Sequence, residues 1–240
     1  MSLVNVAIVA VDGFSPFHYS VPCILFGDSV SGENRFNVTI CAETPGFLTS
    51  KDGFALNATQ DFTAIGQADI VVVPYWQHVL ERPPQTLLDS LVQARDRGAK
   101  IVGLCLGSFV LAWAGILDGK RAATHWEFER QFQSLFPNVR LDINALYVDD
   151  GNIITSAGTA AALDCCLYII RQRFGSVVAN QIARRMIVPP HREGGQAQFI
   201  AQPVPKDTRD GRINCLIDYL QQHITEQHSL DSLAEVVSMS

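Results

Sequence analysis

The sequence predicts an α/β fold in which a mostly parallel sheet is covered by helices on both faces. Short apolar runs that are typical of buried strands alternate with stretches of helical periodicity through most of the chain. One strand runs directly into a helix through Gly103-Leu104-Cys105-Leu106-Gly107, which is the layout of a nucleophile elbow. With 240 residues and 48% hydrophobic composition, the chain can bury one substantial core and a small second unit.

The strands are predicted from short apolar runs that end at turn residues. They occupy residues 4–11, 36–41, 70–73, 100–102, 146–148 and 153–155. Asp12-Gly13 ends the first strand and Pro74 ends the third. A hairpin over residues 47–56 is predicted from the turns Pro45-Gly46 and Asp52-Gly53 that bracket it.

The helices are predicted from apolar positions at helical spacing and from the residues that end each pattern. They occupy residues 17–26, 86–97, 126–136 and 158–174, together with a helix that starts after the elbow at residues 109–112. Gly98 and Pro137 end the helices at 86–97 and 126–136, and Gly158 opens the long one. Strand and helix therefore alternate, and ligands of such folds bind beyond the carboxyl ends of the strands.

The amino-acid composition of the sequence changes after residue 187. Residues 188–205 contain four prolines and two glycines with several glutamines, which is typical of a linker. Two amphipathic helices are predicted beyond it, at residues 213–224 and 230–237, with Ser229 as the N-cap of the second. We therefore divide the chain into a domain at 1–187, a linker at 188–210 and a helical unit at 211–240.

Bulk properties exclude several classes of protein. The net charge of −6 argues against general affinity for nucleic acid. No apolar run reaches the roughly 20 residues of a membrane span, and no signal peptide precedes the first strand, so we expect a cytoplasmic protein without a membrane partner. The six cysteines show no C-x-x-C spacing, so we expect neither disulfides nor a metal site, and those outside the elbow are expected to be core residues.

The elbow makes Cys105 the first candidate for chemistry. Glycines at positions 103 and 107 are needed because the backbone is strained there and neighbouring segments pass close by. A thiol at the start of a helix also lies near the positive end of the helix dipole, which predicts a lowered pKa for Cys105. Cys105 is therefore either a nucleophile or the floor of a pocket that was once built around one.

Further motifs carry a resemblance to a known family. These are Thr124-His125-Trp126, the segment from Ser156 to Asp164, the stretch Val188-Pro-Pro-His-Arg-Glu-Gly-Gly-Gln and the ending from Leu230 to Ser240. With the elbow, they make the chain resemble GlxA-type transcriptional regulators over almost its whole length. In that family a PfpI-like, class I glutamine amidotransferase-like domain precedes an AraC-type DNA-binding domain. The resemblance implies a flavodoxin-like sheet and no cofactor.

The resemblance also shows where an acid or base beside the cysteine is expected. Hydrolytic relatives often place a histidine after the nucleophile, where this chain has Leu106. Other relatives place a glutamate in the loop after the first strand, where Ser15 stands, and isonitrile hydratases place an aspartate where His18 stands. The resemblance places Thr124-His125-Trp126 near the elbow, which makes His125 the candidate partner of Cys105, because a Cys/His pair can activate a thiolate; the alternative is that His125 caps its helix or lines a pocket.

Ligand recognition is the role that we expect for this sheet edge, and no residue is assigned to catalysis beyond the vestigial candidates Cys105 and His125. Backbone N–H groups at two helix N-termini converge there, a geometry that suits a carboxylate or another anion. Aromatic and proline side chains could supply an apolar wall, or they could simply pack in the core. The expected ligand-binding residues are Phe14, Pro16, Trp76, Cys105, Leu106, His125, Gly158 and Thr159.

The C-terminal helices resemble the opening of an AraC-type domain. Residues 230–240 match the first helix and turn of a helix-turn-helix, with Ala234 where close helix packing needs a small side chain and Ser238 where glycine is usual. The helix that reads bases in the major groove would begin after Ser240. We therefore expect an incomplete helix-turn-helix with no DNA-binding residue in this chain, and no specific operator binding by it.

Three hypotheses follow. The first is a DNA-binding transcriptional regulator, acting on promoter DNA as a homodimer in its full-length form, whose N-terminal domain senses a small metabolite without catalysis. The resemblance makes amino-acid-derived or quaternary-amine effectors plausible. The second is a cysteine-dependent hydratase, amidase or hydrolase that uses Cys105. The third is a protein-interaction scaffold that binds no ligand. This hypothesis applies if side chains fill the pocket.

Overall fold

The computed structural model describes residues 3–27, 35–195, 211–223 and 225–237. The chain divides into two units, Met1–Gln198 and Phe199–Ser240, and each is described by itself. The division falls within the expected linker at residues 188–210. Parts of the expected linker, helices and turn lie outside the described residues: these are residues 196–210 of the linker, Ile224 of the helices and Ser238 of the turn.

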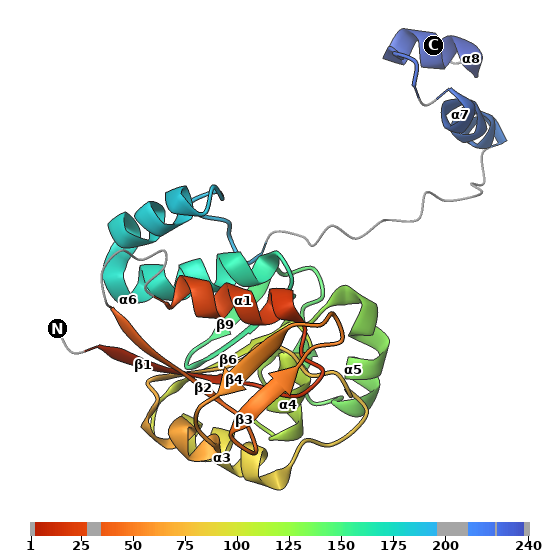
Figure 1. Cartoon of the computed structure of the whole chain (residues 1–240). Helices are drawn as coiled ribbons and strands as arrows, with labels where there is room; N and C mark the ends of the chain where they lie inside the picture. The colour runs from red at the N-terminus through yellow and green to blue at the C-terminus, as the bar shows by residue number, and fades with distance from the viewer. Residues whose placement is uncertain (1–2, 28–34, 196–210, 224, 238–240) are drawn as a thin grey trace. The chain divides into compact units, whose positions relative to one another are not determined.

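A sheet of six strands forms the centre of the first unit (Figure 1). Its order is β2 (Phe36–Cys41), β1 (Val4–Val9), β5 (Ile70–Val73), β6 (Lys100–Leu104), β10 (Ile153–Ser156) and β9 (Tyr147–Asp150). All neighbouring pairs are parallel except β9 and β10, which are antiparallel. This confirms the mostly parallel sheet. The carboxyl ends of β1, β5, β6 and β10 meet at one edge, as parallel pairing requires.

Helices cover both faces of this sheet (Figure 1). One face packs against α1 (Pro16–Leu25) and α6 (Ala161–Arg185), which also contact each other. The other face packs against α3 (Gln85–Asp96), α4 (Gly107–Trp113) and α5 (Glu129–Leu135). Strand residues therefore alternate between two cores: Val72 and Val102 join the first, and Val71 and Ile101 the second.

Smaller elements complete the unit. The predicted hairpin is present as β3 (Gly46–Thr49) and β4 (Ala55–Ala58), paired antiparallel. Three elements that the sequence did not predict are the 3₁₀ helix η1 (Phe62–Gln67) and the paired two-residue strands β7 (Arg121–Ala122) and β8 (Arg140–Leu141). Residues 126–136 form the 3₁₀ helix η2 (Trp126–Phe128) followed by α5. Such short pieces carry too few residues to show a period.

The predicted end of the long helix at Phe174 agrees with a break at Gly175, where φ is 86° and ψ is 171°, values outside the helical region. A second helical stretch follows within α6 and continues to Arg185, which the sequence did not predict. After the break, buried Ala179, Ile182 and Ala183 join the core on the α1 side. No described helix is long and apolar enough to cross a membrane.

The second unit contains α7 (Gly211–Gln222) and α8 (Leu230–Val236). Ser229 is the N-cap of α8, as predicted: its hydroxyl accepts the backbone N–H of Ser232, and the Ser232 hydroxyl accepts that of Ser229. The expectation that all cysteines outside the elbow are core residues is wrong for Cys215, which is exposed on α7. All six cysteines are free.

Candidate functional site

The elbow has the geometry that its glycines predicted. Cys105 adopts φ 49° between β6 and α4, a left-handed conformation that non-glycine residues rarely adopt. A Cβ at position 107 would lie 1.9 Å from the Val73 carbonyl oxygen, and one at position 103 would lie 3.0 Å from the Ser108 Cα. Only glycine therefore allows β5 and α4 to pass this close to the turn. The strain holds Cys105 at the carboxyl edge of the sheet.

The loop after β10 packs directly on the elbow. The Cys105 N–H donates to the Ser156 carbonyl oxygen at 2.9 Å, and a Cβ at position 158 would lie 2.0 Å from the Cys105 Cβ. Gly158, at φ 81°, is thus in contact with the candidate nucleophile, and exposed Thr159 follows at φ 47° before α6 begins. The structure brings Cys105 and the start of α6 together, as the sequence analysis expected.

Thr124 fixes the next segment against the elbow. Its hydroxyl bonds the Ser108 hydroxyl at 2.8 Å and donates to the Cys105 carbonyl oxygen at 3.3 Å. Thr124 and Ser108 are both fully buried. His125 is therefore held near Cys105 by its predecessor in the chain.

His125 acts as the N-cap of η2. Its Nδ1 accepts the Glu127 N–H at 3.4 Å and lies 3.7 Å from a Glu127 carboxylate oxygen, while its ring stacks on Trp126. Among the described residues, no hydrogen bond joins the Cys105 thiol to His125. Burial lowers the pKa of His125, and Glu127 only partly opposes this. The capping alternative thus describes His125 better than the role of a general base.

His18 is the residue that sequence reasoning passed over. Its Nδ1 bonds the Ser15 hydroxyl at 2.7 Å, and its ring lies 5.2 Å from that of Tyr75, which comes from the end of β5. The buried Nε2 has no hydrogen-bond partner among the described residues. Burial, with a smaller effect of nearby His125, lowers the pKa of His18 to about 4. His18 stands where the resemblance places the aspartate of isonitrile hydratases, so the sequence did point to this position, although a histidine is not the carboxylate expected there.

The expected lowering of the Cys105 pKa is wrong. Burial raises the pKa of this thiol to about 12, because desolvation of a thiolate outweighs the stabilising hydrogen bond from the Leu106 backbone, and Glu127 adds repulsion. Cys105 is only 4% exposed. The helix dipole argument failed because α4 is short and the sulfur lies in a dry environment, where the desolvation penalty dominates. The same surroundings raise the pKa of Tyr75.

The remaining expected ligand residues lie at the same edge but in different environments. Phe14 is 4% exposed and packs edge-on against Tyr19 in the core. Pro16 is the first residue of α1, and Leu106 is buried as the N-cap of α4. Half-buried Trp76 donates its indole N–H to the His78 carbonyl oxygen and packs on the second core. Phe14 is thus a packing residue, whereas Trp76 keeps an accessible face.

Two surface hollows lie at the opposite edge of the sheet. One of about 280 Å³ is lined by strand-start residues such as Val4, Ile70 and Lys100, and one of about 240 Å³ lies beside Asn5 and Asn37. Neither includes a residue of the cysteine site. Within the described part of the chain, no group of three or more His, Cys, Asp or Glu side chains is arranged to hold a metal ion.

Comparison with known proteins agrees with this geometry. Residues 4–172 match the model of the DJ-1/PfpI family. The chain belongs to the DJ-1/PfpI family. The matched region begins with β1 and ends within α6, so it includes the whole sheet, the elbow and the loop that carries Gly158.

Several characterised relatives of this DJ-1/PfpI chain are regulators. The HTH-type transcriptional regulator CdhR of Pseudomonas aeruginosa is 26% identical over 212 residues, which cover 86% of this chain and 63% of CdhR. The regulator ArgR of the same organism is 30% identical over 151 residues, 63% of this chain and 46% of ArgR. An isonitrile hydratase of Pseudomonas putida is 30% identical over 146 residues, 60% of this chain and 62% of the enzyme. The chain thus spans only part of the length of these relatives.

Solved structures show the same fold. A crystal structure of an AraC family transcriptional regulator from Pseudomonas putida superposes with a TM-score of 0.67 at 21% identity, covering 76% of this chain and 99% of that one. Drosophila melanogaster DJ-1beta gives a TM-score of 0.68 at 19% identity, covering 78% of this chain and all of that one. At these identities the likeness establishes the fold alone.

Proposed function

We propose that this DJ-1/PfpI domain is the ligand-sensing part of an AraC-family transcriptional regulator, and that the Cys105 edge binds a small metabolite without turning it over. The full-length protein would act on promoter DNA as a homodimer. The helices α7 and α8, with the Ser229 capping box, would be the beginning of its DNA-binding domain. The resemblance and the regulators among the relatives support this assignment.

One observation supports the absence of turnover: the charge states at this edge of the sheet do not favour a thiolate. Burial raises the pKa of Cys105 and lowers those of His18 and His125, so near pH 7 the thiol is protonated and both imidazoles are neutral. Reactive cysteines instead lie beside cations that stabilise the thiolate. Glu127 contributes negative charge, which acts in the opposite direction.

The same groups are suited to binding. The buried Nε2 of His18 has no hydrogen-bond partner among the described residues, which costs about 1–3 kcal/mol. A polar ligand that bonds to this nitrogen would recover that cost. The start of α6 at Gly158 and Thr159 favours negative charge. The rings of Tyr75 and Trp76 offer apolar contact. A small molecule with a carboxylate, such as an amino acid or a betaine, fits these requirements.

A thermal-shift screen with amino acids, betaines and polyamines tests the proposal. We expect one class to raise the melting temperature of the wild-type chain and to have a smaller effect on His18→Phe, which fills the site but removes the ring nitrogens. The matched variant His78→Phe changes an exposed histidine and should respond as wild type does. If no compound in the screen stabilises the protein, or if His18→Phe responds fully, the sensor assignment is wrong.

A second function is favoured by the relationship to isonitrile hydratase and by the strained elbow. In this alternative Cys105 is a nucleophile that acts on an isonitrile or amide. Turnover of such a substrate that disappears in Cys105→Ala would establish it. Turnover that persists in Cys105→Ala, or its complete absence in the wild-type chain, would exclude it.

A further inference from the structure

The segment after α6 is fastened to the sensor domain along residues 188–195, which we call the strap. It begins with a turn at Ile187, where φ is 55°, and Val188 packs against the core beside α6. The sequence analysis treated this segment as part of a linker. Instead, its backbone and side chains make specific contacts with β9 and α6, and it precedes the stretch of chain that leads to α7.

Backbone contacts hold the strap to the edge of the sheet. The Gly194 carbonyl oxygen accepts the N–H of Leu146 at 2.6 Å and that of Tyr147 at 3.4 Å. A Cβ at position 194 would lie 2.3 Å from the Tyr147 carbonyl oxygen, whereas one at Gly195 would have nothing within 4 Å. The strap therefore approaches β9 so closely that only glycine fits at position 194.

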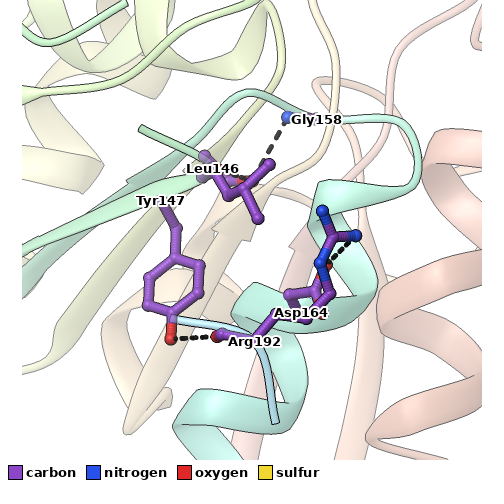
Figure 2. A network of polar contacts seen from close by, with 6 residues as sticks. Leu146, Tyr147, Gly158, Asp164 and Arg192 are labelled. Atoms are coloured by element: carbon purple, nitrogen blue, oxygen red, sulfur yellow. Dashed lines mark hydrogen bonds and ion pairs between the residues drawn. The ribbon is translucent and has the colours of Figure 1, made fainter. Parts of the chain in front are cut away.

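Side chains reinforce this attachment (Figure 2). Arg192 pairs with Asp164 of α6 at 3.3 Å, and its carbonyl oxygen accepts the Tyr147 hydroxyl at 3.0 Å. Arg171, also on α6, donates to the Pro190 carbonyl oxygen at 2.7 Å. Because the Asp164 side chain is only 8% exposed, its ion pair with Arg192 is shielded from water.

Leu146 connects the strap to the Cys105 site. Its N–H donates to Gly194, while its carbonyl oxygen accepts the Ala157 N–H at 2.8 Å and the Ser156 hydroxyl at 3.0 Å. The Ser156 hydroxyl in turn accepts the Gly158 N–H at 3.2 Å, and Gly158 is in contact with Cys105. A chain of hydrogen bonds thus runs from the strap to the candidate ligand site.

We propose that the strap is a ligand-responsive latch: its attachment at Gly194 and Arg192 is coupled, through Leu146 and Ser156, to the position of Gly158 over Cys105. This inference rests on the proposed sensor function of that site. Ligand occupancy and strap attachment favour each other, because both need the Ser156–Gly158 loop where it now lies. By thermodynamic reciprocity, releasing the strap must loosen the site as much as disturbing the site loosens the strap.

The coupling can be measured without a known ligand, using Gly194→Ala as the variant that detaches the strap. Two readouts are needed in the full chain: hydrogen exchange of the Leu146 amide, and the rate at which iodoacetamide alkylates Cys105, followed by mass spectrometry of the peptide that contains it. We expect exchange about tenfold faster and alkylation about fivefold faster or more than in wild type. Gly195→Ala is the matched control and should leave both unchanged.

The reverse direction uses Ser156→Ala, which removes the hydroxyl between Leu146 and Gly158. We expect faster exchange at Leu146 although the strap itself is unaltered. Thr155→Ala is the control, because this neighbouring hydroxyl accepts the Ala123 N–H and does not face the strap. Exchange at Val71 in the central strand β5 reports whether the domain stays folded in each variant.

Three results would overturn the latch. The first is exposure of the Leu146 amide in Gly194→Ala with an unchanged alkylation rate at Cys105, because the strap would then be free without any effect on the site. The second is unchanged exchange at Leu146 in Gly194→Ala or in Ser156→Ala. The third is an equal response of Gly194→Ala and Gly195→Ala. Failure of the metabolite screen would contradict the sensor function but would leave these measurements informative, so the two failures are distinguishable.

Discussion

Gly158 and Cys105 are in direct backbone contact, so that the Cβ of any other residue at position 158 would lie 2.0 Å from the Cys105 Cβ and 2.5 Å from its Cα. Both residues also have positive φ, 81° and 49°. Two strained turns from different strands therefore support each other at the carboxyl edge of the sheet. Such strain persists only where the surrounding structure imposes it.

We expect Gly158→Ala to lower the free energy of unfolding by about 2–4 kcal/mol, since it adds a steric clash to the cost of a positive φ. Urea denaturation measures this. Gly151→Ala is the matched control, because Gly151 has φ 75° but a Cβ added there would have nothing within 4 Å, and it should cost only about 1 kcal/mol. Equal costs for the two variants would show that the contact with Cys105 contributes nothing.

Alkylation of Cys105 should show the raised pKa of its thiol. With a pKa of about 12, the thiolate fraction grows about tenfold for each pH unit, so the rate should keep rising from pH 7 to pH 10 without a plateau. A cysteine in a short unstructured peptide with blocked termini, whose ordinary thiol pKa is near 8.5, should approach its plateau within that range. A midpoint below pH 8 for Cys105 would contradict the site that we describe and would favour the nucleophile alternative.

Protonation of His18 should destabilise the domain. The pKa of His18 is lowered from 6.5 to about 4 in the folded state, so the unfolded chain binds a proton more readily than the folded one. The free energy of unfolding is therefore at its full value above pH 6.5 and decreases as the pH falls toward 4. The loss should amount to about 2–3 kcal/mol. His18→Asn keeps a partner for Ser15 but cannot titrate, so its unfolding free energy should fall less steeply over this range.

Urea unfolding at half-unit pH steps measures the difference. The corresponding change at exposed His78, His78→Asn, controls for the loss of a histidine as such. If the wild-type chain and His18→Asn lose stability in parallel between pH 6.5 and 4, His18 is not held neutral in the folded protein.

Much of the fold follows from local signals in the sequence. The strand β5 coincides with its apolar run, because a parallel strand buried on both faces needs continuous hydrophobic residues. The edge strand β2 also has the predicted bounds, although its four middle residues are exposed or half-buried. The close approach of neighbouring segments to the elbow was also predictable, since glycines stand two residues either side of Cys105. The helical stretch after Gly175 was not, because the apolar pattern ends at Phe174 and only tertiary packing against the core stabilises the residues that follow.

The electrostatics of the site could not be predicted in this way. The pKa of Cys105 depends on how much water the fold removes from the sulfur, a property of segments distant in sequence. The unpaired Nε2 of His18 arises for the same reason, since Tyr75 packs on its ring from another strand. The strap was misjudged because proline and glycine indicate irregular backbone, whether it is free or attached by specific bonds.

The ion pair between Arg192 and Asp164 should stabilise the domain in a manner that depends on pH. Burial raises the pKa of Asp164, and Arg192 is the main group that lowers it. In Arg192→Ala the Asp164 carboxylate is left without this partner, so near pH 7 we expect the free energy of unfolding to fall by about 1–2 kcal/mol. This is less than for a fully buried pair, because Arg192 is 27% exposed and water screens its charge. At pH 4.5 the loss should be smaller, because protonation of Asp164 removes the unpaired charge.

A double-mutant cycle with Asp164→Asn isolates this pair. In the Asp164→Asn background, the Arg192→Ala change should cost less at pH 7 than it does in the wild-type chain, and its pH dependence should disappear. Arg173→Ala, an exposed change on α6, should stay within about 0.5 kcal/mol of wild type at both pH values. An equal cost of Arg192→Ala in both backgrounds would mean that the Arg192 side chain stabilises the strap through its packing, and that the charge pair with Asp164 is not what fastens it.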